Sequence, residues 1–283
     1  MVSTPVILAS AQAEVLLAAH ASGMPETTIS PDLGISHETV KLSDSGVTFA
    51  IGEHLDWARV EKIARSEINC FQLEDGDIHA IQYFSEDTSR MCSLMPTRGA
   101  PTMLIAGFTM HRIVDIDPMQ DTRKKMETLK PVVGRVLDTT TGLGYTAITA
   151  AHTAEHVTTI EFDPGAQYIA RRNPWSRELF DNPKIQQMMG DAYEIVPSFA
   201  ENSFDRIVHD PPVFSLAGQL YSATFYRELY RVLKKGGRLF HYIGNLESKS
   251  SGTVARGAFK RLQEAGFKRV VRRPEAFGIL AYK

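Results

Sequence analysis

The fold is decided by the stretch VLDTTTGLGY at residues 136–145, which predicts an apolar strand opening through a glycine-rich turn into a helix. Gly142 and Gly144 lack the Cβ atoms that would keep a ligand away from the backbone, and the helix N-terminus favours a negative group. The third glycine of the dinucleotide fingerprint is missing. Glu161 stands 17 positions after Gly144, at the end of the next expected strand, where a carboxylate can accept both ribose hydroxyls. The pattern therefore favours a nucleoside ligand over a dinucleotide.

Acidic residues stand at or near the ends of four successive expected strands, namely Asp138, Glu161, Asp191 and Asp210. Asp191 follows the strand expected over residues 185–189, where a short carboxylate suits an adenine amino group. Ligands of parallel sheets bind at the carboxyl ends of the strands. A helix cap or a turn explains any one of these carboxylates, whereas the joint spacing of all four favours a single ligand site.

Residues 117–283 alternate between strand and helix patterns, which indicates an α/β fold with helices on both faces of a mostly parallel sheet. The last two strands are separated only by residues 273–276, too few for a crossover, so they are expected to form an antiparallel hairpin. We expect strands over residues 134–138, 156–162, 185–189, 206–208, 238–243, 268–272 and 277–282, and helices over 117–130, 145–153, 165–172, 223–233 and 253–265.

Residues 1–116 are predicted to form a separate small α+β domain that recognises the substrate, followed by a catalytic domain over 117–283. The sequence Glu-Asp-Gly-Asp at 74–77 predicts a hairpin, because Gly76 can take the positive φ of a tight turn. In this domain we expect helices over 5–21 and 55–68, a segment rich in turn residues over 30–46, and strands over 70–73, 78–84, 91–95 and 102–110.

The composition is that of a globular chain. Of 283 residues, 43% are hydrophobic and 23% charged, which excludes disordered, collagen-like and coiled-coil proteins. Cys70 and Cys92 have neither CxxC spacing nor nearby histidine ligands, so no zinc site or disulfide framework is indicated. The apolar N-terminal run has no basic residue before Lys41 and is interrupted by Gln12 and Glu14, which argues against a membrane helix or export signal. We therefore expect a cytoplasmic protein.

Charge is distributed unevenly along the chain. Residues 1–120 hold 7 basic and 16 acidic side chains, whereas residues 121–283 hold 24 and 17. Residues 234–283 alone hold 12 basic and 3 acidic side chains. Such a region attracts phosphates and therefore suits an RNA partner. Pairing of these basic residues with the acidic half of the chain explains the uneven charge equally well.

The motifs of residues 134–283, in this order, resemble those of the class I S-adenosylmethionine-dependent methyltransferases. The resemblance implies a Rossmann-like catalytic domain, S-adenosyl-L-methionine as the cofactor, and no metal. It assigns residues 138–144 to the methionine part of the cofactor, Glu161 to the ribose, and Asp191 with Ala192 to the adenine. The cofactor-binding residues expected are Asp138, Thr140, Thr141, Gly142, Gly144, Tyr145, Glu161, Phe162, Asp191 and Ala192.

The segment Asp210-Pro211-Pro212 resembles the (Asp/Asn/Ser)-Pro-Pro-aromatic motif of methyltransferases that act on planar amino or amide nitrogens. The Asp210 carboxylate and the Pro211 carbonyl would accept the two hydrogens of the amino group and orient its nitrogen for attack. Val213 stands where the motif has its aromatic residue. The base is therefore expected to stack on Phe214 or on Trp175, although core packing also explains Trp175.

Longer runs resemble an archaeal family of methyltransferases that was once labelled only as predicted. They are IQYFSE at residues 81–86, DTTTGLGYTA at 138–147, NPWSRELF at 173–180 and HDPPVFSLAG at 209–218. This resemblance covers most of the chain beyond about residue 70. It implies methylation, once or twice, of the N4 amino group of cytidine, with ribosomal RNA or the small ribosomal subunit as the partner.

Other residues near the motifs are weaker candidates for substrate contacts. His209, beside Asp210, suits a general base or a buried structural histidine. His111 and Arg112 suit contacts to the cofactor or an RNA phosphate, or a domain interface.

Alternative functions remain open. Adenosine N6 and a protein glutamine amide present the same planar NH2, so the motif does not separate them from cytidine. A polyamine aminopropyltransferase shares the fold, but the Pro-Pro pair and the basic surroundings argue against a cationic substrate. The set of four carboxylates argues against a catalytically silent adaptor. The oligomeric state is not indicated.

Overall fold

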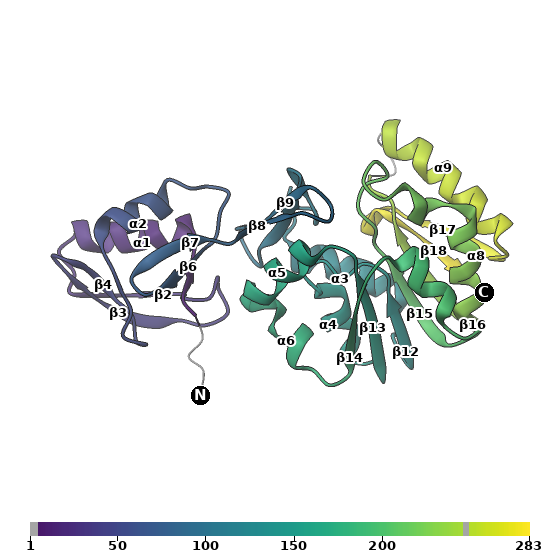
Figure 1. The fold of residues 1–283 in the computed structure, drawn as a ribbon, viewed down its shortest axis with the longest axis horizontal. Helices are drawn as coiled ribbons and strands as arrows, with labels where there is room; N and C mark the ends of the chain where they lie inside the picture. Colours follow the sequence, from purple (N-terminus) through teal and green to yellow (C-terminus); the bar gives the residue numbers. More distant parts are fainter. Residues whose placement is uncertain (1–4, 246–248) are drawn as a thin grey trace. The chain divides into compact units, whose positions relative to one another are not determined.

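The computed structural model describes residues 5–245 and 249–283, which form two compact units (Figure 1). The first unit contains the chain up to Pro118 together with Tyr168–Arg177, and the second unit contains Met119–Gln167 and Glu178–Lys283. A short segment from the C-terminal half of the chain therefore packs with the N-terminal part. Within the described ranges, every helix falls short of the length and apolarity needed to cross a membrane.

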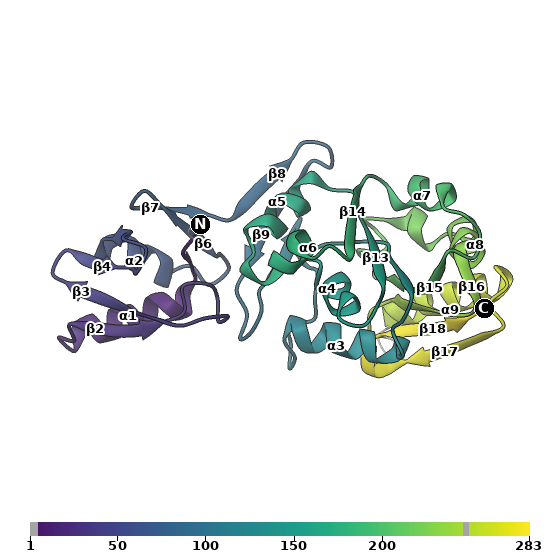
Figure 2. The same cartoon turned by 90° about the horizontal axis from the view of Figure 1, so that it is seen from below.

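One mixed sheet organises the second unit. Its strands are β12 (Arg135–Asp138), β13 (His156–Glu161), β14 (Ile185–Met189), β15 (Phe204–His209), β16 (Leu233–Tyr242), β17 (Arg269–Arg273) and β18 (Gly278–Tyr282). They lie in the order β14-β13-β12-β15-β16-β18-β17 (Figures 1 and 2). The strands from β14 to β16 run parallel, whereas β18 is antiparallel to both β16 and β17. This topology confirms the predicted α/β, Rossmann-like sheet with its C-terminal antiparallel hairpin.

The strand order reverses beside β12, which is where sheets of this kind bind ligands. From β12 the chain runs outward through β13 to β14, and it then returns to add β15 on the other side of β12. Such a reversal opens a crevice at the carboxyl ends of the two central strands. Asp138 ends β12, and Asp210 directly follows β15.

Helices and short turns connect the strands. They are α3 (Pro118–Leu129), α4 (Tyr145–Ala151), α5 (Pro164–Arg172), η1 (Pro174–Ser176), α6 (Arg177–Asp181), α7 (Ala192–Ile195), η2 (Val196–Ser198), η3 (Gly218–Tyr221), α8 (Ala223–Val232), α9 (Lys249–Glu264) and η4 (Pro274–Ala276). Helix α8 shows why these residues fold locally: Ser222 caps its first turn by accepting from the Phe225 amide at 3.1 Å. Phe225, Leu229 and Val232 then recur at helical spacing and are buried in the core.

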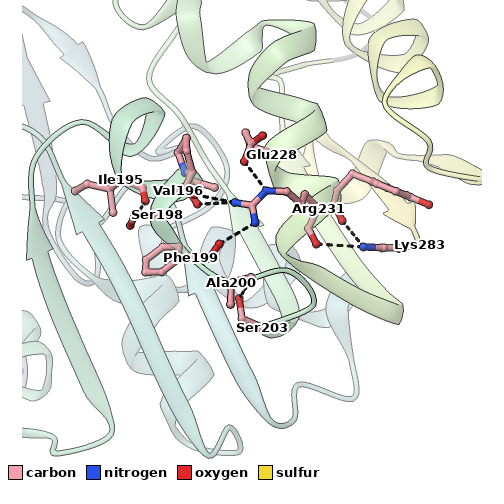
Figure 3. Close-up of polar contacts among 11 residues, drawn as sticks. Ile195, Val196, Ser198, Phe199, Ala200, Ser203, Glu228, Arg231 and Lys283 are labelled. Atoms are coloured by element: carbon pink, nitrogen blue, oxygen red, sulfur yellow. Dashed lines mark hydrogen bonds and ion pairs between the residues drawn. The ribbon is translucent and has the colours of Figure 1, made fainter.

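Two cations, Arg231 and Lys283, have structural roles at the end of α8 (Figure 3). Arg231 pairs with Glu228 at 2.7 Å and donates to the carbonyls of Phe199 and Pro197 at 2.8 and 3.0 Å. Lys283 donates to the carbonyls of Tyr230 and Arg231 at 2.7 and 3.2 Å. These bonds satisfy carbonyls at helix ends that have no partner within their helices.

The first unit holds α1 (Ser10–Ala21), α2 (Trp57–Ala64) and three antiparallel sheets. The sheets are β1 (Ile7–Leu8), β6 (Phe71–Glu74) and β7 (Asp77–Ala80); β2 (Glu26–Ile29), β3 (Glu38–Ser43), β4 (Gly46–Thr48) and β5 (His54–Leu55); and β8 (Gln82–Ser85), β9 (Arg90–Met95), β10 (Thr102–Ile105) and β11 (Phe108–Thr109). Leu16 of α1 and Val60 of α2 are fully buried in a core shared with Val40 of β3. The predicted hairpin is confirmed, because Asp75 and Gly76 take positive φ between β6 and β7.

Four expectations for the first unit were wrong in detail. The strand expected over 78–84 is divided between β7 and β8, which pair with β6 and β9 in different sheets. The helix expected over 5–21 begins only at Ser10, because Ile7 and Leu8 pair with β6. The turn-rich segment 30–46 contains strand β3 and the start of β4, whose short polar sequences conceal a strand pattern. The strand expected over 102–110 is itself a hairpin, since Ala106 and Gly107 take φ of 49° and 82° between β10 and β11.

Candidate functional site

The glycine-rich turn after β12 is held by backbone hydrogen bonds. Thr141 donates its amide to the Ile160 carbonyl of β13 at 2.8 Å, and the Gly144 amide donates to Thr141 at 2.8 Å. Gly142 and Gly144 take φ of 53° and 76°, a region that favours glycine. A Cβ at Gly144 would lie 2.7 Å from Leu179, so this glycine also makes room for a protein side chain. Its contact with a ligand stays a prediction.

Asp138 is fully buried beneath the turn. It accepts from the hydroxyls of Thr146 in α4 and Thr159 in β13 at 2.9 and 3.2 Å. Burial raises the pKa of Asp138 to about 7, opposed by the Thr146 hydrogen bond. Asp138, at the end of β12, therefore links β12 to α4 and to β13 through hydrogen bonds. Thr141 adds a 2.7 Å hydroxyl contact to Thr159, and the side chain of Tyr145 is buried.

Glu161 joins the turn to the ends of β13 and β14. Its Oε2 accepts from the Gly142 amide at 2.8 Å and its Oε1 from the Asp163 amide at 2.9 Å. Its main-chain carbonyl accepts from the Gly190 amide at 2.8 Å. Burial raises the pKa of Glu161 to about 7, although both amides favour the charged form. The predicted ribose carboxylate thus lies against the glycine-rich turn.

The end of β14 supplies the other residues expected to meet the adenine. Asp191 caps α7 by accepting from the Tyr193 amide at 2.8 Å, and the following Ala192 is buried. Phe162 and Met189 are 54% and 43% exposed, unusual values for large apolar side chains. Met189 is paired in register with Glu161. An apolar surface therefore lies beside the two carboxylates.

The Asp-Pro-Pro loop after β15 is anchored at both ends. Thr140 donates its hydroxyl to the main-chain carbonyl of Asp210 at 2.8 Å, which joins this loop to the glycine-rich turn. The Tyr221 hydroxyl donates to the Pro212 carbonyl at 2.9 Å. Phe214 is 53% exposed, and its ring meets the Tyr221 ring edge-on at 5.5 Å between centroids. The loop is therefore fixed, with an aromatic side chain exposed next to it.

A buried lysine holds the Asp210 side chain. The Lys125 ammonium in α3 lies 2.7 Å from Asp210 Oδ2 and 2.8 Å from Asp121 Oδ2. Sequence reasoning missed this residue. The sequence pattern nevertheless indicated a buried lysine, because Lys125 lies on the apolar face of an amphipathic helix, with the buried Met126 and Leu129.

His209 does not meet the expectation that it touches substrate or acts as a base. It is fully buried, and its Nε2 lies 2.9 Å from the Leu220 carbonyl, an acceptor only, so Nε2 carries the hydrogen. Nδ1 then accepts from the Thr139 hydroxyl at 2.7 Å. Burial lowers the pKa of His209 to about 3. The histidine is a neutral structural group beneath the Asp-Pro-Pro loop.

The other substrate candidates belong to the first unit. The Trp175 indole donates to the Leu33 carbonyl at 3.0 Å. This contact agrees with core packing, the alternative role that the sequence allowed for Trp175. His111 contacts the Thr102 hydroxyl through Nδ1 at 3.0 Å. Substrate binding by Trp175, His111 and Arg112 stays a prediction.

Comparison with known proteins agrees with the topology of the sheet. A family model described as a methyltransferase domain matches residues 137–241, from β12 to β16. The second unit therefore has the Rossmann-like fold of class I methyltransferases, and most of its sheet lies within the matched residues. The chain belongs to the same family as the uncharacterized protein MJ1233 of Methanocaldococcus jannaschii, with 42% identity over 226 residues, 79% of this chain and 77% of that protein.

Shorter or weaker matches are to enzymes of polyamine synthesis. A polyamine aminopropyltransferase of Aeropyrum pernix is 32% identical over 88 residues, 29% of this chain and 28% of that protein. Two solved spermidine synthases share the fold at 18% identity. One, in complex with the transition state analogue AdoDATO, has a TM-score of 0.57 over 73% of this chain and 76% of that one. The other, from Thermotoga maritima, has a TM-score of 0.56 over 73% and 75%.

Proposed function

We propose that this protein is an S-adenosylmethionine-dependent N-methyltransferase that acts on the exocyclic amino group of an RNA base. The proposed target is N4 of cytidine in ribosomal RNA, methylated once or twice. The observation that carries the proposal is the anchored Asp-Pro-Pro loop, whose Asp210 and Pro212 carbonyls are held by Thr140 and Tyr221. This loop follows β15 and the glycine-rich turn follows β12, so both lie at the carboxyl ends of neighbouring parallel strands.

The residues at the ends of β12, β13 and β14 fit the methyl donor. Glu161 would hold the ribose hydroxyls, and Asp191 the adenine amino group. The exposed Phe162 and Met189 offer apolar surface to the adenine ring. Gly142, at positive φ, lets the backbone of the turn approach the methionine end. When bound, S-adenosylmethionine supplies the electrophilic methyl group.

The Asp-Pro-Pro loop fits a planar amine. The Asp210 carboxylate and the Pro211 carbonyl would accept its two hydrogens and orient the nitrogen for in-line attack. Phe214 would stack on the base, a contact worth about 1–3 kcal/mol. Exposed basic side chains, including Lys268, Arg269 and Arg272, would contact RNA phosphates.

A second candidate is aminopropyl transfer to a polyamine from decarboxylated S-adenosylmethionine. The sequence match to the Aeropyrum pernix enzyme and the shared fold favour it. Lys125 argues against it, because an ammonium 2.7 Å from Asp210 disfavours a cationic amine at the same carboxylate.

The test is incubation of the full chain with methyl-labelled S-adenosylmethionine and either ribosomal RNA or small-subunit particles from a strain that lacks the gene, followed by nucleoside mass spectrometry. Label in N4-methylated cytidine, absent with Asp210→Ala, supports the proposal. Label in adenosine keeps the reaction but rejects the target. Absence of label in any RNA, together with aminopropyl transfer from the decarboxylated donor to putrescine, refutes the proposal in favour of the second candidate.

A further inference from the structure

Lys125 forms a buried charged cluster with two carboxylates from different parts of the chain. The side chains of Lys125, Asp121 and Asp210 are 1%, 0% and 15% exposed. Asp121 and Lys125 lie four residues apart in α3, so they share one face of the helix. Asp210 comes from the loop after β15, 85 residues later in the chain. The Lys125 ammonium also lies over the Tyr242 ring of β16, 4.4 Å from its centroid.

The lysine in this cluster stays charged. Burial alone would lower the pKa of Lys125, but Asp210 and Asp121 outweigh burial and raise it. Two carboxylates and one ammonium give the cluster a formal charge of −1. The attraction within a buried group of ions offsets the cost of removing them from water only where the geometry of their contacts is good. Its geometry here is set by two contacts of 2.7 and 2.8 Å to one nitrogen.

The cluster has two consequences for Asp210. First, the contact through Oδ2 fixes the orientation of the carboxylate, while Thr140 fixes the main-chain carbonyl of the same residue. Second, the ammonium offsets the negative charge of the carboxylate. A neutral planar amine can still donate a hydrogen bond to such a group. A cationic amine would approach an ammonium in a partly buried site, where repulsion is weakly screened.

We propose that Lys125 is a positioning and specificity residue, which orients Asp210 for an uncharged amino group and excludes cationic amines from it. The first part of this proposal, that Lys125 orients Asp210 for methyl transfer, rests on the proposed function. The second part, exclusion of cations, can be measured without turnover.

The experiment compares the double variant Asp121→Asn with Lys125→Met against the wild type. This variant removes one buried cation and one buried anion, so the formal charge of the cluster stays −1 and Asp121 is not left as an unpaired ion. The matched control is Lys124→Met, which removes the neighbouring but exposed lysine of the same helix. Thermal melting and the affinity for S-adenosylhomocysteine check that each variant is folded. The readouts are kcat and KM with the RNA substrate, and putrescine affinity by calorimetry.

We expect kcat of the double variant to fall on the order of 100-fold, because a misplaced reacting group costs about that much, while the donor affinity is unchanged. We expect putrescine to bind about tenfold more tightly, since the like charge has been removed. Lys124→Met should match the wild type in both. A kcat within threefold of the wild type, or a loss of kcat that only follows a loss of donor affinity, overturns the positioning role. An unchanged putrescine affinity overturns the exclusion role. Failure of the wild type to methylate RNA refutes the proposed function instead, and the putrescine measurement then still decides on exclusion.

Discussion

The hydroxyl of Thr140 donates to the main-chain carbonyl of Asp210 at 2.8 Å, across 70 residues of sequence. This one bond joins the glycine-rich turn after β12 to the Asp-Pro-Pro loop after β15. The proposed donor site and the proposed amine site are therefore parts of one hydrogen-bonded unit. A shift in one would change the distance between donor and acceptor.

Thr140→Val should uncouple the two loops with little effect on the fold. Loss of one hydrogen bond is expected to lower the free energy of unfolding by about 1 kcal/mol. Methyl transfer should fall more, about tenfold or beyond, because reacting groups must be held in near-attack geometry. Steady-state kinetics and chemical denaturation measure the two effects. Thr149→Val is the matched control, since among the described residues that hydroxyl bonds within α4, to the Tyr145 carbonyl at 2.7 Å. Full activity of Thr140→Val would contradict the coupling.

Asp210→Asn should abolish turnover while leaving donor binding largely intact. The amide keeps the size of the side chain, but it loses the charge that pairs with Lys125. A group aimed at the reacting atoms is worth about 100- to 1000-fold in rate. Methyl transfer and the affinity for S-adenosylhomocysteine should therefore separate in this variant. Retained turnover would remove Asp210 from the proposed mechanism.

The sequence alone predicted the positions of those site residues that lie at the ends of strands. Asp138 ends β12, Glu161 ends β13, and Asp210 follows β15, because apolar runs mark buried parallel strands and their carboxyl ends share one edge. The antiparallel pairing of β17 with β18 followed from the short connection between them.

The contacts between distant residues could not be predicted in the same way. The pairing of Lys125 with Asp210 depends on how α3 packs against the sheet, which no local pattern specifies. For His209 the sequence left a general base and a buried structural histidine open, because its neighbour Asp210 suggested chemistry; strand alternation turns adjacent side chains to opposite faces, and the structure buries His209. The segment 30–46 was misjudged because its strands are short and polar, so their pairing rather than their propensity decides the structure.

Donor binding should depend on pH through Glu161. Its pKa is raised to about 7, so the carboxylate is largely protonated at pH 6 and ionised at pH 8. Only the ionised form accepts hydrogen bonds from both ribose hydroxyls. We therefore expect the affinity for S-adenosylhomocysteine, measured by calorimetry, to rise across this range. Asp138 titrates near the same pH, so assignment requires Glu161→Gln, which should bind weakly and without this pH dependence.

The control for this prediction is Glu155→Gln, an exposed glutamate just before β13. It should keep both the affinity and the pH dependence of the wild type. A wild-type affinity that is constant from pH 6 to pH 8 would argue against Glu161 as the ribose carboxylate.

His209 should affect stability in acid rather than catalysis. Its pKa is about 3 in the folded protein and about 6.5 when unfolded. The unfolded chain therefore binds more protons between these values, and stability rises with pH across this window. Below pH 6.5 the free energy of unfolding should fall by up to about 1.4 kcal/mol per pH unit from this residue. Burial lowers the pKa of His241 as well, so its contribution has the same sign.

His209→Gln distinguishes the structural role from a catalytic one. The amide does not titrate, so the slope of stability against pH, measured by denaturation at several pH values, should become smaller. Overall stability should also fall, because the bonds to Thr139 and Leu220 are disturbed. The acid limb of the kcat profile should stay where it is in the wild type, because a fully buried ring bonded at both nitrogens has no access to substrate. A shifted acid limb in a folded variant would restore His209 as a general base.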